Sequence, residues 1–593
     1  MHIEAQIQNA IQSALKEIYN VEEQAIALQP TKKDFQGFYT FVTFSYTKSL
    51  RKPPVEIGHT LGQYLVENTS VVSSFNVVQG FLNLDITESA WMAALNTLAL
   101  KADFGFHPTN RQSVMVEFSS PNTNKPLHLG HLRNVFLGDS VARILQANGY
   151  EVIKTCLVND RGIHICKSML AYAKLGNGET PESSGLKGDH LIGKYYVLFD
   201  KEYKRQIEIL VAQGMAKEMA EKQAPWMQEA QQLLLKWEQG DPETIALWQQ
   251  LNGWVYAGFD ETYQKIGVSF DKMYYESNTY LLGKEVVEEG LTKGVFFKKP
   301  DNSVWVDLTA EGLDEKLVLR GDGTSVYITQ DLGTTDLKFA DFHNEKSIWV
   351  VGNEQDYHFQ VLFAIMKRLE RSYANGCYHL SYGMVDLPSG KMKSREGTVV
   401  DADELVAEVI AAAAEEGNAK GKIEDFSEAE KQKLFSELGL GALKYYLLKV
   451  DPQKRMLFNP AESVELHGHT GPFIQYTHAR TRSILRKALK MGIDWIRPAA
   501  SATPLTAIEK EVIFCLTQFP DRVADAGRNY SPALISQYAY ELAKAYNSLY
   551  AEVSILQEPN ADAQHTRLLL SQAVADTLQK AMKLLGIEVP DRM

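Results

Sequence analysis

The most constraining feature of the chain is the stretch from residue 114 to residue 134, VMVEFSSPNTNKPLHLGHLRN. Residues 114–118 form a short apolar run, typical of a strand that is buried in a parallel sheet. After a loop with two prolines, apolar residues recur with helical spacing at Leu137, Val141 and Leu145. This spacing predicts a helix with one apolar face that begins near Gly130. A strand, a loop and a helix start in this order favour a phosphate site, because the first helical turn leaves backbone N–H groups unpaired.

Three side chains of this stretch could hold phosphate groups. Lys125, His128 and His131 carry N–H donors on one short segment. Gly130, between the histidines, would let a flat base approach the backbone closely. For an isolated HxxH pair, a proline-rich loop whose histidines only cap a helix is the alternative interpretation.

Other informative segments also end in polar residues where a strand is expected to end. Residues 151–160 and 347–352 are predicted strands, and the second of them runs into the polar sequence NEQDYH. Active sites of open α/β sheets lie at the carboxyl edge of the strands. A second motif, GMVDLPSGKMKSREGT, occupies residues 383–398.

The two motifs together resemble the signatures of a known enzyme family. SPNTNKPLHLGHLRN is similar to the HIGH signature of class I aminoacyl-tRNA synthetases, in the form that arginyl-tRNA synthetases carry, and residues 383–398 resemble the KMSKS loop. The resemblance implies an α/β fold: a Rossmann-type parallel-sheet catalytic core with a helical insertion, an N-terminal α+β domain and a C-terminal all-α helical-bundle domain. It implies catalytic roles for Lys125, His128, His131 and Lys391.

The second motif departs from the family pattern at one position. Aligned on Lys391 and Met392, the second lysine of KMSKS falls on Ser394. Lys393 in the same motif or Lys125 ahead of the first motif could supply the missing cation, and we favour Lys125 because arginyl-tRNA synthetases often carry a lysine there. The resemblance implies ATP binding by a set of residues from both motifs: Gly130, His128, His131, Lys391, Met392, Lys393 and Ser394.

The substrate pocket is assigned largely from the resemblance. Tyr327 and Asp331 are four residues apart and would share one face of a helix. Together with Glu276 they match the groups that hold the arginine guanidinium, which binds best to carboxylates that accept bidentate hydrogen bonds. Asn122 and Gln355 match the groups that hold the amino and carboxyl ends of the substrate.

We expect four segments. They are an N-terminal tRNA-binding α+β domain at residues 1–108, with a simple packing module as the alternative; a catalytic domain at 109–400 with a helical insertion at about 166–265; a connecting helical segment at 401–465; and an α-helical anticodon-binding domain at 466–593. Within the insertion, Gly176 to Asp189 is expected to be a flexible surface loop. Residues 268–271 are expected to resume the sheet.

Composition limits the remaining possibilities. The net charge of −13 argues against nonspecific coating of nucleic acid, whereas residues 470–593 hold 14 Lys and Arg against 12 Asp and Glu. Four cysteines without a CxxC pair give neither a disulfide framework nor a zinc site, so we expect no tightly bound metal. The sequence has no long apolar run and no signal-peptide pattern, which favours a cytoplasmic protein without a membrane span.

The function that the resemblance implies is that of an arginine–tRNA ligase. ATP, with Mg²⁺, would activate L-arginine as arginyl-adenylate, and the arginyl group would pass to the 3′ terminal adenosine of tRNA(Arg), with the chain acting as a monomer. Two rivals stay open at this stage. One is a small-molecule nucleotidyltransferase that shares the HxGH site, and the other is a noncatalytic tRNA-binding paralogue, to which only Ser394 points.

Overall fold

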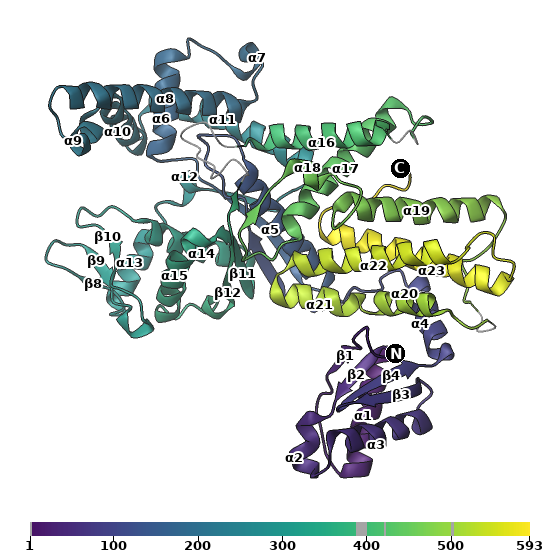
Figure 1. The fold of residues 1–593 in the computed structure, drawn as a ribbon. Coiled ribbons are helices and arrows are strands. Elements are labelled where there is room, and N and C mark those ends of the chain that lie inside the picture. The colour runs from purple at the N-terminus through teal and green to yellow at the C-terminus, as the bar shows by residue number, and fades with distance from the viewer. Residues whose placement is uncertain (1–2, 387–399, 420–422, 500–502) are drawn as a thin grey trace.

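The computed structural model describes residues 3–386, 400–419, 423–499 and 503–593. Figure 1 shows an N-terminal domain, a central catalytic region with two groups of elements projecting from it, and a layer of long helices toward the C-terminus. The predicted architecture of parallel core, α+β N-terminal domain and helical C-terminal domain is confirmed. Among the helices of the described segments, none has the length and hydropathy needed to cross a bilayer.

The catalytic core is a five-stranded parallel sheet with the order β12-β11-β5-β6-β7. In chain order, β5, β6 and β7 extend the sheet toward one edge, and β11 and β12 are then added on the other side of β5. The strand order therefore reverses beside β5, and ligands of open α/β sheets bind in the crevice at such a point. The strands are β5 (Ser113–Glu117), β6 (Glu151–Val158), β7 (Lys272–Tyr275), β11 (Lys346–Gly352) and β12 (Cys377–Tyr382).

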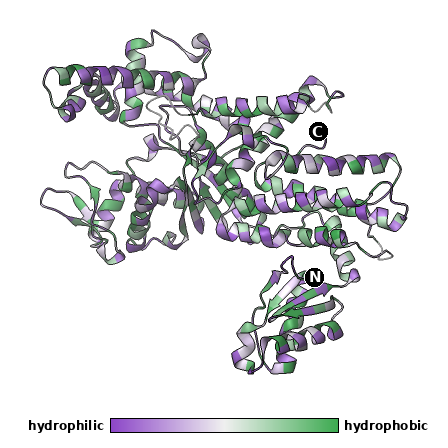
Figure 2. Ribbon diagram, viewed as in Figure 1, coloured by the Kyte–Doolittle hydropathy of each residue, from purple (hydrophilic) through white to green (hydrophobic). Residues whose placement is uncertain are grey.

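Helix α5 (Leu129–Ala147) follows β5 and occupies the centre of the molecule. It begins one residue before Gly130, close to the prediction. The expected single apolar face is wrong, because most of its residues are buried, including the polar Arg133, Asn134 and Asp139. The sheet covers one side of α5 and the C-terminal helices cover the other. In Figure 2 the central strands are largely hydrophobic, and the outlying helices are mixed.

Two insertions separate the strands. The first lies between β6 and β7 and is helical: α6 (Ile163–Leu175), α7 (Pro181–Ser184), α8 (Gly188–Ala212), α9 (Lys217–Gln223), α10 (Pro225–Glu238) and α11 (Pro242–Ile266). The second joins β7 to β11 and contains a small antiparallel sheet that the sequence analysis did not anticipate: α12 (Glu276–Thr279), α13 (Gly283–Thr292), β8 (Phe297–Lys298), β9 (Val304–Val306), β10 (Lys316–Leu319) and α14 (Tyr327–Phe342). Helix α15 (Asp356–Arg368) follows β11.

Two local expectations in this region differ from the structure. The sheet is expected to resume at Val268 and to reach Tyr275, but strand β7 begins four residues later, at Lys272, and ends at Tyr275. The segment from Gly176 to Asp189 contains α7 and the start of α8, and Asp189 is fully buried. Its glycines suggested a loop, but partners from distant segments cover its end, which no local pattern reveals.

The N-terminal domain packs helices α1 and α3 on an antiparallel sheet of order β1-β2-β4-β3. Strand β2 ends at Val42, and a 3₁₀ turn follows at Phe44–Tyr46. The elements are α1 (Ile3–Tyr19), β1 (Leu28–Pro30), β2 (Tyr39–Val42), α2 (Thr47–Leu50), α3 (Pro54–Asn68), β3 (Val72–Val78), β4 (Phe81–Ile86) and α4 (Glu88–Leu100).

Beyond the core the chain is almost entirely helical, apart from a short parallel pair of strands, β13 with β14. Tyr538 and Tyr546 are buried here, as expected for core residues. The elements are β13 (Val385–Asp386), α16 (Ala402–Ala419), α17 (Glu428–Leu448), β14 (Met456–Leu457), α18 (Pro460–Ser463), α19 (Gly471–Lys490), α20 (Ala507–Thr517), α21 (Phe519–Asn529), α22 (Pro532–Glu552) and α23 (Ala561–Leu584).

The contact between α5 and the loop after β5 yields a stability prediction. A Cβ atom on Gly138 would lie 2.2 Å from Cγ of Phe118, which is fully buried and has no room to move. Gly138→Ala should therefore destabilise the protein by about 1–3 kcal/mol through overpacking, measured as a lower midpoint of thermal unfolding. Gly253→Ala in α11 is the matched control, because no atom lies within 4 Å of its added Cβ. It should be neutral or stabilise by about 0.5–1 kcal/mol. Equal midpoints for the two variants would contradict the packing argument.

Candidate active site

The first signature forms the N-terminal cap of α5. His128 is the cap residue, and its Nδ1 accepts a hydrogen bond from the Gly130 N–H at 3.2 Å. Nδ1 of His131 accepts from the backbone N–H of His128 at 3.1 Å. Since both Nδ1 atoms accept hydrogen bonds, a neutral ring must carry its proton on Nε2. The fold therefore leaves two Nε2–H donors at the start of the helix.

Both histidines are neutral at physiological pH. Burial, helped by the nearby Lys125 charge, lowers the pKa of His128 to about 3. Burial also lowers the pKa of His131 well below its usual range, with further contributions from His128 and Lys125. The histidines thus offer hydrogen bonds rather than charge, and Lys125 is the cation that accompanies them. The positive end of the α5 dipole points to the same place.

A cavity of about 420 Å³ opens beside this signature. Lys125 and His128 line one wall, and His190 and Lys194 of α8 line the other. Asp401, just after the second signature motif, closes the cavity. Lys391, Met392, Lys393 and Ser394 lie outside the described residues.

A second cavity, of about 470 Å³, lies where the strand order reverses. It brings together three of the predicted arginine-binding residues: Tyr327, Asp331 and Gln355. Tyr327 and Asp331 are on α14, which confirms the predicted helix. The Asp331 carboxylate is 2.6 Å from Nε2 of His358, a residue that the sequence analysis assigned no role.

Glu117 is a second acidic group of this cavity that the sequence analysis missed. It is the last residue of β5 and is almost fully buried, paired with the equally buried Lys338 of α14. The sequence does contain a signal for this position, because a carboxylate at the carboxyl end of a buried strand faces the binding edge of the sheet. The acidic residues that the resemblance assigns to the pocket, Glu276 and Asp331, lie further along the chain.

The remaining predicted pocket residues lie outside this cavity. Glu276 lines a third cavity, of about 530 Å³, which shares Tyr327 with the second and also contains Arg161. Burial raises the pKa of Glu276 to about 7, and Asp331 is close enough to contribute. Asn122 is exposed and pairs with Asn159 beside the signature loop.

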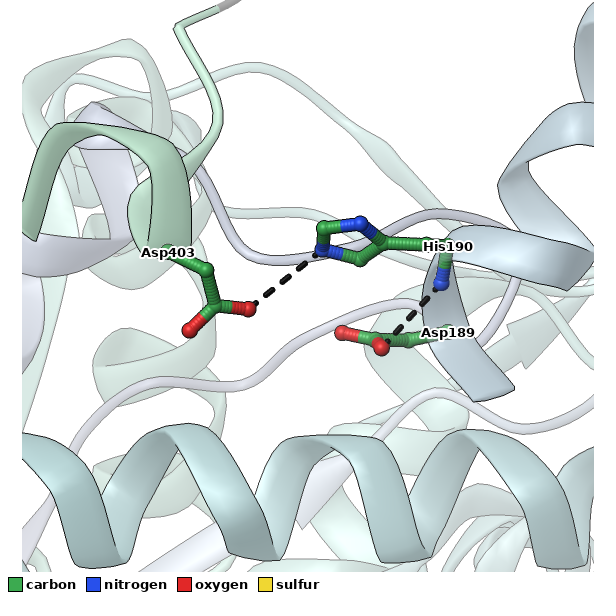
Figure 3. A group of neighbouring side chains, drawn as sticks. All are labelled: Asp189, His190 and Asp403. Carbon is green, nitrogen blue, oxygen red and sulfur yellow. Dashed lines mark hydrogen bonds and ion pairs between the residues drawn. The ribbon is translucent and has the colours of Figure 1, made fainter. Parts of the chain in front are cut away.

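Among the described residues, Asp189, His190 and Asp403 form a group whose side-chain oxygen and nitrogen atoms lie within 4.8 Å of one another (Figure 3). Such a group could hold a metal ion. A protein cation already occupies this place, however. The Lys187 ammonium contacts Asp403 and is 3.3 Å from Asp189. The charge of this donor set is therefore compensated by a lysine.

Comparison with known proteins defines the class of enzyme. Residues 94–459 match the family model "tRNA synthetases class I (R), catalytic domain", residues 474–593 match "DALR anticodon binding domain", and residues 5–86 match "Arginyl tRNA synthetase N terminal domain". The first model alone covers more than half of the chain. The chain is thus an enzyme of the class I aminoacyl-tRNA synthetases, whose fold binds ATP.

Full-length relatives narrow the class further. Proteins named arginine–tRNA ligase from Amoebophilus asiaticus and Bacteroides fragilis are 55% and 54% identical to the chain, each over 100% of both sequences. The solved structure of Thermus thermophilus arginyl-tRNA synthetase matches with a TM-score of 0.81 and 26% identity over 100% of both chains. The chain belongs to the arginyl-tRNA synthetase family.

The position of Glu276 leads to a prediction about pH. An always-charged guanidinium favours an ionised carboxylate, and Glu276, with a pKa of about 7, is protonated at lower pH. If Glu276 contributes to the pocket, arginine affinity should fall by up to about tenfold per pH unit below pH 7. Calorimetric titration of arginine at several pH values measures this. The variant Glu276→Gln should lose the dependence.

Glu117→Gln is the comparison variant. It should weaken arginine binding strongly at every pH, because removal of one partner leaves the buried Lys338 unpaired. If Glu276→Gln leaves both the affinity and its pH dependence unchanged, Glu276 is outside the pocket, and Glu117 with Asp331 carries recognition alone.

Proposed function

We propose that the chain is an arginine–tRNA ligase whose two chemical steps take place at the reversal point of the sheet, between the signature cavity and the cavity that holds Asp331. The observation that carries this proposal is the pairing of two groups: neutral Nε2–H donors with a lysine at the start of α5, and two carboxylates in the cavity that contains Asp331. Substrates are ATP, L-arginine and tRNA(Arg).

In the first step the arginine carboxylate attacks the α-phosphate of ATP, giving arginyl-adenylate and pyrophosphate. The Nε2–H groups of His128 and His131 donate to the phosphate oxygens as negative charge shifts, and Lys125 adds a full charge. Donors fixed in a buried place need little reorganisation, so they stabilise the transition state more than donors in water. Magnesium is expected to arrive with the triphosphate and to neutralise part of its charge. Lys391, in the second signature, is proposed to stabilise the charge that develops on the phosphates in the same step.

In the second cavity, charge selects the substrate. Glu117 and Asp331 carry negative charge, and Lys338 compensates the first of them. Two carboxylates against one lysine leave a surplus of negative charge, which suits one guanidinium. Gln355 lines the same cavity and is proposed to hold the amino and carboxyl ends of arginine, together with Asn122. Tyr327, whose side chain is 78% exposed, is free to close over the guanidinium from α14.

In the second step a hydroxyl of the 3′ terminal adenosine of tRNA takes the arginyl group and releases AMP. The C-terminal helices are proposed to hold the anticodon. The Arg480 guanidinium lies 4.9 Å and 4.8 Å from the ring centres of Tyr476 and Tyr550, and cations beside exposed aromatic rings suit unpaired bases. We further propose that the enzyme acts as a cytoplasmic monomer.

Neither rival interpretation accounts for the whole chain. A small-molecule nucleotidyltransferase has no need of an anticodon-binding domain, and residues 474–593 match one. A noncatalytic paralogue gains no support from the described part of the site, where both histidines have the hydrogen bonds that prepare them as donors.

The role of His128 can be tested by kinetics. His128→Ala removes one donor and should lower the rate of arginine-dependent ATP–pyrophosphate exchange by about 10²–10³-fold, with little change in arginine affinity. His107→Ala, at an exposed position before β5, is the control and should behave like the unchanged protein. An equal loss of exchange rate and of arginine affinity would contradict the proposal that His128 acts on the phosphates.

Substrate identity is tested by charging total tRNA with each labelled amino acid in turn, in the presence of ATP and magnesium. We expect charging with arginine alone. Charging with a different amino acid would support the class I reaction but contradict the proposed arginine pocket. Binding of tRNA without any charging would instead support the noncatalytic paralogue.

A further inference from the structure

An ion network joins the helical insertion to the residues that follow the second signature. His190, near the start of α8, places Nε2 3.2 Å from Asp401 Oδ2 and 3.3 Å from Asp403 Oδ2. Lys187 contacts Asp403 as well, and its ammonium donates to Thr262 of α11 at 2.6 Å. Three segments that are far apart in the sequence, α8, α11 and the start of α16, thus meet around two aspartates. Figure 3 shows His190 pointing from α8 toward Asp403.

The aspartates are connected directly to the first signature through the backbone. Asp401 lies opposite His128 in an antiparallel bridge. The Leu129 N–H donates to the Val400 carbonyl at 3.1 Å, and the Ala402 N–H donates to the Leu127 carbonyl at 3.0 Å. Whatever holds Asp401 in place therefore also fixes the backbone on both sides of His128.

The charges of the network favour its assembled state. The Asp403 carboxylate raises the pKa of His190, and Asp401 and Asp189 add to this effect against burial. Although burial alone would raise it, the pKa of Asp403 is lowered by His190 and Lys187. The pKa of Lys187 is raised despite burial, because two carboxylates surround its ammonium.

Other charged groups also face His190. Lys187 lies on its own helix and opposes its protonation. Lys125, Lys194 and Lys201 line the same cavity and add positive charge. His128 lines it too but is neutral and adds no charge. The two aspartates are nearer than these lysines, in direct contact with Nε2, so their effect dominates.

We propose that His190 is a positioning residue for the first signature. In its charged form it ties α8 to Asp401 and Asp403, and through the backbone pairing of Asp401 it holds His128 at the start of α5. This inference rests on the proposed function for its effect on catalysis, whereas its effect on the backbone at residues 127–129 does not.

The sign of the pH effect follows from linkage. A histidine whose pKa is higher in the folded than in the unfolded state contributes stability that is complete below the unfolded pKa. That contribution is lost as the pH rises through the folded pKa. The pairing between residues 127–129 and 400–402 should therefore loosen as the medium becomes more alkaline.

Hydrogen exchange of the full-length protein tests the backbone part. Protection of peptides that contain Leu129 and Ala402 is compared from about pH 6 to about pH 9, where histidines titrate, after correction for intrinsic exchange rates. Protection should fall with rising pH in the unchanged protein. It should be low and independent of pH in His190→Gln, and high throughout in His190→Lys, which keeps a cation. His59→Gln, on α3 of the N-terminal domain, is the control for a histidine exchange at a remote exposed position.

Kinetics of ATP–pyrophosphate exchange test the catalytic part. His190→Gln should lower kcat by about tenfold to a hundredfold, as small misplacements of catalytic groups do, with the KM for arginine unchanged, and His190→Lys should restore kcat at alkaline pH. If His190→Gln keeps the protection and the pH profile of the unchanged protein, the inference is wrong. A complete lack of arginine-dependent exchange in the unchanged protein with tRNA present would overturn the proposed function instead, and hydrogen exchange would still decide whether His190 holds the signature backbone.

Discussion

The structure depends on the burial of helix α5 from both sides. A helix in this position can carry polar residues only if every one finds a partner, because unpaired buried polar groups are costly. The partners come from different parts of the chain. Arg133 donates to the carbonyls of Leu447, Pro452 and Lys454, Asn134 donates to Val350 of β11, and Ser140 donates to Leu584 at the end of α23.

This arrangement ties the catalytic sheet, the connecting segment and the terminal helices to one element. The same helix begins with His128 and His131, so the reacting end of α5 is fixed by contacts made along its whole length. Lys444 of α17 continues the connection, since its buried ammonium donates to the Gly586 carbonyl at 2.6 Å. Burial lowers the pKa of Lys444 to about 8. A shift of α23 therefore cannot leave the signature helix unaffected.

Charge in the active site is arranged in pairs rather than as isolated groups. Lys338 accompanies Glu117, His358 accompanies Asp331, and Lys187 accompanies Asp403. Buried carboxylates without a partner would lose their charge. His190 and Lys187 lower the pKa of Asp403 against the effect of burial. In the second cavity, Glu117 and Asp331 face one lysine, which leaves a small surplus of negative charge where the cationic substrate is proposed to bind.

The sequence alone determined the elements whose signals are local. Residues 113–117 and 151–158 form strands close to where apolar residues predicted them, and α5 begins one residue before its predicted start near Gly130. Tyr327 and Asp331 share one helix, α14. The signature residues Lys125, His128 and Gly130 were found because they are neighbours in the chain. Only the tertiary structure decided which carboxylates share a cavity. Glu117, and not Glu276, lines the cavity that contains Asp331. Asp189 is buried, and His190 contacts Asp401, which is more than two hundred residues away in the sequence. Such pairings follow from strand order and from the packing of insertions, and no local pattern in the sequence records them.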